Sequence, residues 1–319
     1  MEGGEFLKYI KPFNKVWLGC MNNLKLSLLL TLKKEAERFA YFNSYEYIAN
    51  QEISGGNNNF YNLTICNYFL EMEQFSDVSE ISVPEKNELK DIIISQLEKE
   101  RGYVILYVDL FNWLEGSVSW KKFHWQHYSL VADYDKSNDK YVVFDERQGK
   151  YVEFMVDFET LYSSIVRDIE KKGVIQLVDL KEKFSLPSLT ITDIKENVKR
   201  TCDSIVNVLT KNFFLQMSDN DFRARSHMEL NGIYLQRIEG RQRANQMFVD
   251  SFMQEHCFSD LKTEFAYLEK RWLDIRLNLY KSYFDEEERK DDLELVNSEI
   301  KDVLRKEMDL WSRIESSIK

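Results

Sequence analysis

The spacing of apolar and polar residues changes along the chain, and each change marks a different kind of structure. From Met21 to about Phe42, apolar residues recur every three or four positions, which predicts a helix. The same spacing predicts a second helix from Pro84 to Glu100. The period then shortens, and runs rich in β-branched and aromatic residues predict strands at 103–110, 127–134, 140–144, 152–154 and 174–180.

Turn and capping residues indicate how these elements connect. The segment Asp135–Asp139 is rich in turn formers and joins the strands on either side of it into a hairpin. Asp157 is expected to cap a helix that runs to about Lys171, and Gly173 is expected to end it. Strands joined by short turns indicate an antiparallel sheet, so the first part of the chain is expected to be an α+β domain.

A second change follows Pro187, where helical periodicity takes over and continues to the end of the chain. Thr192 or Asp193 is expected to cap the first helix of this part. We therefore expect two domains, an α+β domain over 1–186 and an all-helical domain over 187–319.

Composition and charge narrow the class of protein. The 319 residues carry a formal net charge of −11, and binding to nucleic acid phosphates needs a clustered positive field, so no nucleic acid partner is expected. No apolar run approaches the roughly 20 residues of a membrane span. The apolar stretch 24–32 contains Lys25 and precedes no cleavage site, so we expect neither a signal peptide nor a membrane partner.

The number and spacing of the cysteines also narrow the class of protein. The sequence has 4 of them, far apart and without a CxxC pair, so neither a structural zinc site nor a disulfide framework is expected. The sequence also lacks a glycine-rich phosphate loop of the Walker or Rossmann kind. We expect a cytoplasmic protein that uses no metal and no cofactor.

The order of three residues in the first domain predicts a catalytic site. Cys20 lies at the start of the first predicted helix, where partial positive charge and free N–H groups lower the pKa of a thiol. His127 opens a strand and is a candidate to accept and return the proton of the thiol. Asp145 closes the neighbouring strand, from which a carboxylate can fix the tautomer of the imidazole. Together they predict a cysteine nucleophile with a catalytic histidine and aspartate.

Each of these residues also has an ordinary interpretation. A single cysteine is most often a small buried apolar residue, a histidine near aromatic residues is often only packed at the surface, and an aspartate after a strand often belongs to a turn. His124 is a rival for the catalytic histidine, but apolar strand residues follow His127 directly, which favours His127. The two histidines could also chelate a metal, yet no third ligand is evident.

Acyl transfer through a thiol also needs donors for the oxyanion of the intermediate. The backbone N–H of Cys20 is the first candidate. Asn14, six residues before Cys20, is the candidate for a side-chain donor, although a single asparagine at that offset is easily a coincidence. Aromatic residues before His127 are candidates to line an acyl pocket or to cover the edge of the sheet, and they are Trp113, Trp120, Phe123 and Trp125.

Four segments together resemble a known family. They are the helix start Gly19-Cys20, the strand Tyr103–Leu110, the strand His127-Tyr128-Ser129-Leu130-Val131-Ala132-Asp133-Tyr134-Asp135 and the strand Val142-Val143-Phe144-Asp145. They resemble the N-terminal domain of the butirosin biosynthesis protein H family, over roughly residues 10–185. The same pattern is shared with bacteriocin-processing peptidases of the C39-like superfamily.

This resemblance implies a papain-like fold. It implies an enzyme that moves an acyl group from a carrier-protein thioester to an amine in antibiotic biosynthesis, through a cysteine thioester. It carries over Cys20, His127 and Asp145 as the catalytic residues. Asn14 stands at the offset at which papain-like enzymes carry a glutamine. One departure is Ala132, where the family often has a glycine.

An arginine cluster in the helical part is a candidate for docking an acidic, phosphate-bearing carrier protein. A solvated helix face with intrahelical ion pairs is the ordinary alternative. The cluster comprises Arg223, Arg225, Arg237, Arg241 and Arg243.

Three functions from different classes remain open on the sequence alone. The first is a cysteine-dependent acyltransferase that takes its acyl group from a carrier-protein phosphopantetheine thioester, or another thioester, and passes it to a small amine. The second is a papain-like hydrolase, a peptidase or amidase. The third is a catalytically inactive scaffold that binds a partner through the helical domain.

Overall fold

The computed structural model describes residues 8–16, 18–42, 44–53, 59–68, 71–115, 119–122, 124–147, 150–167, 173–211, 215, 221–252, 259–284 and 289–318. The chain divides into two compact units. The first takes in the N-terminal residues up to Lys15 together with 19–37 and 70–186, and the second takes in 16–18, 38–69 and 187–319. One boundary thus lies where the composition changes, but residues 38–69, which we assigned to the first domain, cluster with the helical unit.

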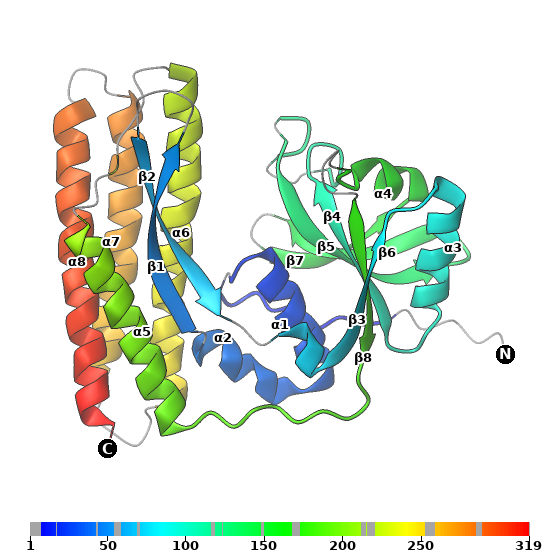
Figure 1. The fold of residues 1–319 in the computed structure, drawn as a ribbon, viewed down its shortest axis with the longest axis horizontal. Coiled ribbons are helices and arrows are strands. Elements are labelled where there is room, and N and C mark those ends of the chain that lie inside the picture. Colours follow the sequence, from blue (N-terminus) through cyan, green and yellow to red (C-terminus); the bar gives the residue numbers. More distant parts are fainter. Residues whose placement is uncertain are drawn as a thin grey trace. The chain divides into compact units, whose positions relative to one another are not determined.

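The first unit is built around a sheet with the strand order β3–β8–β4–β5–β6–β7, in which all neighbours run antiparallel (Figure 1). Strands β4 to β7 follow one another along the chain as a meander, and β8 then returns to lie between β3 and β4. The bounds are β3 (Ser76–Ser82), β4 (Gly102–Asp109), β5 (Gln126–Asp135), β6 (Lys140–Arg147), β7 (Lys150–Val156) and β8 (Val174–Leu180).

Helices bury the middle of this sheet. Side chains alternate between the two faces of a strand, and in β4 both sets are buried, which explains its unbroken apolar run. Val104 and Leu106 join the core cluster that contains residues of α3 (Lys86–Leu97) and α4 (Phe158–Ser164). The helix α1 (Cys20–Leu32), which is apolar for most of its length, packs against β5. Two short 3₁₀ turns, η1 (Lys34–Glu37) and η2 (Met72–Gln74), complete the unit.

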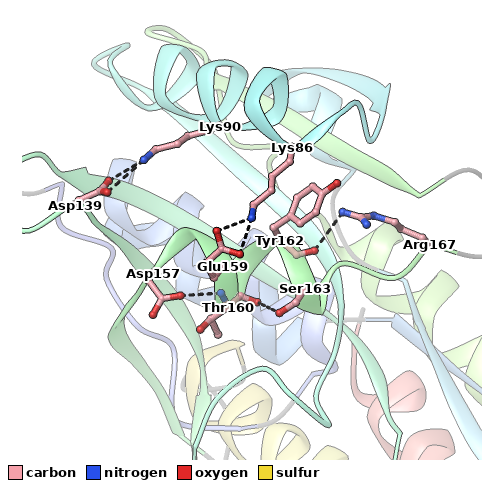
Figure 2. A network of polar contacts seen from close by, with 9 residues as sticks. All are labelled: Lys86, Lys90, Asp139, Asp157, Glu159, Thr160, Tyr162, Ser163 and Arg167. Carbon is pink, nitrogen blue, oxygen red and sulfur yellow. Dashed lines mark hydrogen bonds and ion pairs between the residues drawn. The ribbon is translucent and has the colours of Figure 1, made fainter.

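Charged contacts connect α3 to α4 and to the turn between β5 and β6 at the surface of the first unit (Figure 2). Lys86 Nζ lies 2.6 Å from Glu159 Oε1, and Lys90 Nζ lies 3.1 Å from Asp139 Oδ1. Asp157 caps α4 as predicted, because its Oδ1 accepts a 2.8 Å hydrogen bond from the backbone N–H of Thr160. The two ion pairs are exposed, so each contributes no more than about 1 kcal/mol to stability.

The second unit combines a long hairpin with helices (Figure 1). Its strands β1 (Ser44–Ile53) and β2 (Asn59–Tyr68) run antiparallel, with Ser44 opposite Tyr68. Contacts run from β1 to α5, α5 to α8, α8 to α7, α7 to α6 and α6 back to β2, so the hairpin closes a ring of helices. The helices are α2 (Arg38–Phe42), α5 (Ile191–Thr210), α6 (Asp221–Phe252), α7 (Ser259–Phe284) and α8 (Arg289–Ser317).

A buried carboxylate holds the hairpin of the second unit to the helices. Glu307 of α8 has no exposed surface and accepts hydrogen bonds from Tyr45 Oη at 2.5 Å and Tyr47 Oη at 2.6 Å. It also accepts from Gln242 Nε2 at 2.7 Å, and the indole nitrogen of Trp311 lies 3.4 Å away. Burial raises the pKa of Glu307, although its hydrogen-bond donors oppose the shift.

The structure confirms an α+β chain with an antiparallel sheet and a helical C-terminal region, and the strand at 174–180 has the predicted bounds. The single helix predicted from Met21 to Phe42 is wrong. The helix α1 ends at Leu32 because Lys33 takes an extended conformation, with φ −143° and ψ 113°, although the apolar period continues past it.

Other differences concern caps and short strands. The first C-terminal helix is capped by Thr190, and Asp193 is its capping-box partner rather than the cap. The helix after Asp157 ends at Ser164, because Ile165 leaves it to pair with Val108. The strands β1, β2 and β3 were not predicted.

Over the described ranges, none of the helices combines the length and apolar character that crossing a membrane requires.

Candidate active site

Cys20 is the first residue of α1, and the turn before it leaves the helix start open. Gly19 has a φ of 102°, a conformation that side-chain-bearing residues avoid, and no side chain caps the helix. Hydrogen bonding from the backbone N–H groups of Met21 and Tyr128 helps to lower the pKa of the Cys20 thiol. Of these two residues, Met21 lies in the first turn of α1, where backbone N–H groups have no partner within the helix.

His127 and Asp145 come from neighbouring antiparallel strands. In the register of β5 and β6, Leu130 lies opposite Phe144, which places the His127 and Asp145 side chains near one another at the same end of the pair. The Nε2 atom of His127 lies 2.8 Å from Oδ1 of Asp145 and 3.0 Å from its Oδ2. The expected contact between the two side chains is therefore present, and Nδ1 is the ring nitrogen left for the Cys20 thiol.

Two further donors fix the carboxylate of Asp145. The indole N–H of Trp113 donates to Oδ2 at 2.7 Å, and the backbone N–H of Glu146 donates to Oδ1 at 2.6 Å. Asp145 has no exposed surface, and Trp113 is 2% exposed. A buried carboxylate that is hydrogen-bonded on both oxygens keeps one orientation.

The charges of Cys20 and His127 support each other. Burial opposes a charged thiolate, but hydrogen bonding to His127, the positive charge of that ring and two backbone N–H groups outweigh burial and lower the pKa of Cys20. Burial also opposes a charged imidazole, but the carboxylate of Asp145 and the cysteine outweigh it and raise the pKa of His127 to about 10. Both shifts favour a thiolate–imidazolium pair near neutral pH.

The rival His124 lies in a different environment. Its Nδ1 atom is 2.6 Å from Oδ2 of Asp109, its ring stacks on Phe111 with centroids 4.6 Å apart, and its side chain is exposed. The contact with Asp145 belongs to His127, and it is His127 that lowers the pKa of Cys20. Among the described residues, no group of three or more His, Cys, Asp and Glu side chains is arranged to hold a metal ion.

Asn14 anchors the loop that leads to Cys20. Its Nδ2 donates to the carbonyl of Tyr151 at 3.1 Å, and its Oδ1 accepts from the N–H of Tyr151 at 2.7 Å. Tyr151 Oη lies 3.5 Å from the carbonyl oxygen of Cys20. The two residues therefore attach the loop and the start of α1 to β7. The role of Asn14 as an oxyanion donor stays a prediction. The contact with Tyr151 uses one of the two amide hydrogens of Asn14, and the other is left for an oxyanion.

The arginine cluster does not form one exposed surface. Arg241 is 3% exposed, and its guanidinium donates to the carbonyls of Ala40 and Tyr41 at 3.3 and 2.5 Å and to Asn245 Oδ1 at 3.1 Å. Burial lowers its pKa to about 10. Its inclusion in a docking surface was therefore wrong, because its guanidinium is buried and donates to backbone carbonyl groups inside the second unit.

The remaining arginines of the cluster differ in exposure. Arg243 is exposed and pairs with Glu269, and Arg237 is half-buried, with its guanidinium carbon 5.4 Å from the ring centroid of Tyr234. Arg223 and Arg225 lie in α6, where their side chains are outside the described part.

Sequence reasoning missed two residues that organise the site. Trp113 was considered for a pocket wall or a sheet edge, and its bond to Asp145 depends on a loop path that apolar spacing does not encode. Tyr151 lies directly before the strand predicted at 152–154, and nothing in the neighbouring sequence indicated contact with Asn14. Phe123, another aromatic residue of the same loop, lies outside the described residues.

No protein-family model matches this chain, and no curated protein matches its sequence.

Proposed function

We propose that this protein is a cysteine-dependent acyltransferase that takes an acyl group from a carrier-protein thioester, or another thioester, and passes it to an amine. The observation that carries the proposal is the chain of contacts from Cys20 through His127 to the buried Asp145. Resemblance to the butirosin biosynthesis protein H family supports a thioester donor and an antibiotic-type product, and it supports a papain-like identity for the first unit.

The steps follow from the charges in the site. The Cys20 thiolate attacks the thioester carbonyl carbon, and the tetrahedral intermediate collapses as His127 gives its Nδ1 proton to the departing thiol. The result is an acyl-Cys20 thioester and a neutral imidazole. An amine then attacks the same carbonyl, His127 takes a proton from that amine, and the Cys20 thiolate leaves as the amide forms. Each atom and proton is accounted for without a cofactor.

A backbone N–H at the start of α1 is the natural donor to the oxyanion, because it carries the partial positive charge of the helix end. Asp145 holds Nε2 of His127 throughout and stabilises the imidazolium form. Trp113 and Tyr151 act as positioning residues, the first through Asp145 and the second through the loop that holds Cys20.

Hydrolysis is the alternative that the exposure of Cys20 favours. The residue keeps some exposed surface, which gives water as well as an amine access to the site. The same acyl-Cys20 intermediate would then lose its acyl group to water, and the protein would be a peptidase or amidase of the same chemistry.

Intact-protein mass spectrometry tests the proposal. The purified chain is mixed with a short acyl thioester of N-acetylcysteamine, and peptide mapping locates the adduct. We expect a single acyl adduct on Cys20, absent in Cys20→Ala and retained in the matched control Cys202→Ala. Addition of a primary amine should release the acyl group as amide faster than water releases it as acid. A chain that forms no adduct under any condition would leave only the scaffold function.

A further inference from the structure

Two tyrosines beside the thiol have no part in the proposed catalytic steps. Tyr107 of β4 and Tyr128 of β5 lie directly opposite one another in the strand register. Their ring centroids are 4.9 Å apart, and the ring planes are tilted by 44°. Both residues are half-exposed, so their rings offer aromatic surface to whatever enters the site.

Both residues lie beside His127 in the sheet, because Tyr128 follows His127 in β5 and Tyr107 precedes Val108, which lies opposite His127. Hydrogen bonding from the backbone N–H of Tyr128 also lowers the pKa of the Cys20 thiol, so the backbone of Tyr128 belongs to the surroundings of the reacting groups. Burial raises the pKa of Tyr107, and the charge of Cys20 raises it further. The pKa of Tyr128 is raised by burial, by Tyr107 and by Cys20. Both phenol groups thus lie within the electric field of the thiolate.

A second tyrosine pair on the same sheet serves as a structural comparison for Tyr107 and Tyr128. Tyr134 and Tyr141 also have centroids 4.9 Å apart, with a tilt of 37°. Tyr141 is fully buried in the core, and the hydroxyl of Tyr134 donates to Asp139 at 2.6 Å. The pair at the thiol differs because both of its members keep exposed ring surface.

We propose that Tyr107 and Tyr128 form the acyl-binding surface of this site and select donors whose acyl group is planar, aromatic or conjugated. The inference rests on the proposed function, since it assumes that Cys20 accepts an acyl group. An acyl group on the sulfur extends past the backbone of Tyr128, where the two rings can contact a flat group by stacking or edge-to-face contact. A saturated ring of similar size fits such contacts less well.

The test compares two N-acetylcysteamine thioesters of similar size, benzoyl and cyclohexanecarbonyl. The second-order rate constant for acylation of Cys20 is measured for each by intact mass, and their ratio is compared among variants. Intrinsic reactivity cancels in that comparison. We expect Tyr128→Leu and Tyr107→Leu each to lower the ratio about three- to tenfold, the range of one aromatic contact. Tyr128→Phe should keep the ratio, because the ring and not the hydroxyl makes the contact.

Tyr134→Leu is the matched control, because Tyr134 lies in the same strand as Tyr128 and belongs to a tyrosine pair with the same centroid distance. The rate ratio of this variant should equal that of the unaltered protein. Circular dichroism checks that each variant folds, and either leucine variant suffices to decide. An unchanged ratio in a folded Leu variant overturns the inference and leaves the acyltransferase proposal standing. Failure of Cys20 to accept either acyl group, with all variants folded, removes both.

Discussion

Trp113 donates its indole N–H to Oδ2 of Asp145 across 2.7 Å, and neither side chain has appreciable exposed surface. This contact limits the carboxylate to one orientation, in which both of its oxygens lie near Nε2 of His127. The basicity of the histidine therefore depends on a residue in the loop between β4 and β5, away from the three predicted catalytic positions.

The first prediction concerns a variant in which this indole is replaced. Trp113→Phe keeps an aromatic ring but leaves Oδ2 of Asp145 without one donor in a buried place, which costs about 1–3 kcal/mol of unfolding free energy. Alkylation of Cys20 should also slow, because the carboxylate can turn away from His127. Urea unfolding and the rate of thiol alkylation at pH 7 measure the two effects.

Trp272→Phe is the matched control. Trp272 is fully buried, and among the described residues its indole nitrogen has no hydrogen-bond partner, so phenylalanine removes similar volume without breaking a hydrogen bond. The alkylation rate of Cys20 should not change in this variant. Equal alkylation rates in Trp113→Phe and Trp272→Phe would show that the bond to Asp145 has no effect on the thiol.

The second prediction removes the charge of Asp145. In Asp145→Asn the imidazolium loses the carboxylate that holds its pKa near 10, so the pKa of His127 should fall. A neutral imidazole stabilises the thiolate less, and the pKa of Cys20 should rise. Once the pKa of Cys20 lies above the pH, each further unit of rise lowers the thiolate population roughly tenfold.

Absorbance at 240 nm across a pH titration follows the thiolate directly. Asp109→Asn is the control, since Asp109 pairs with the exposed His124 and should leave the titration of Cys20 unchanged. A Cys20 titration that is the same in Asp145→Asn and the unaltered protein would remove Asp145 from the proposed mechanism.

The third prediction concerns the buried carboxylate of the second unit. Glu307→Gln places an amide N–H₂ where the hydroxyls of Tyr45 and Tyr47 now donate to an oxygen. At least one buried donor then loses its acceptor, and the unfolding free energy should fall by about 2–4 kcal/mol. Glu264→Gln, which alters a partly exposed carboxylate paired with Arg313, should change the unfolding free energy by less than about 1 kcal/mol. Similar midpoints of urea unfolding for the two variants would contradict this account.

The fourth prediction tests carrier docking with the exposed member of the arginine cluster. Arg243→Glu should slow acylation by a carrier-bound thioester, because carrier proteins are acidic, and the loss should shrink at high salt as screening removes the attraction. Acylation by N-acetylcysteamine thioesters should not change. Arg241 is unsuitable for this test, since its removal would leave the carbonyls of Ala40 and Tyr41 without a donor and destabilise the second unit. Carrier-dependent rates that are unaffected by Arg243→Glu would exclude this docking surface.

The sequence predicted the parts of the structure that depend on local pattern. Alternating or continuous apolar residues identified the strands on which His127 and Asp145 lie, and the turn formers between Asp135 and Asp139 placed those strands side by side. Position at a helix start identified Cys20. These signals are local, so a single sequence carries them.

Contacts that depend on the path of the chain could not be predicted. Lys33 ends α1 although neither glycine nor proline marks the place, and the strand that contains Tyr45 has a mixed pattern whose helical partners lie far away in sequence. The burial of Arg241 shows the same limit, because a charged residue in a helix resembles a surface residue until its carbonyl partners are known. The partner of Trp113 depends on a loop whose path no periodicity describes.

The central claim is that Cys20 exists as a thiolate beside a protonated His127, and its rate of alkylation as a function of pH tests this most directly. The protein is treated with iodoacetamide from pH 4 to 11, and the modified cysteines are identified by peptide mapping. Cys202 serves as an internal standard, since burial and nearby carboxylates raise its pKa to about 11. We expect Cys20 to react fastest below pH 7, with a rate that rises through its lowered pKa, reaches a plateau and changes again near pH 10 as His127 loses its proton. Preferential labelling of another cysteine at pH 6, or a Cys20 profile with a single rise near the ordinary thiol pKa of about 8.5, would contradict the account.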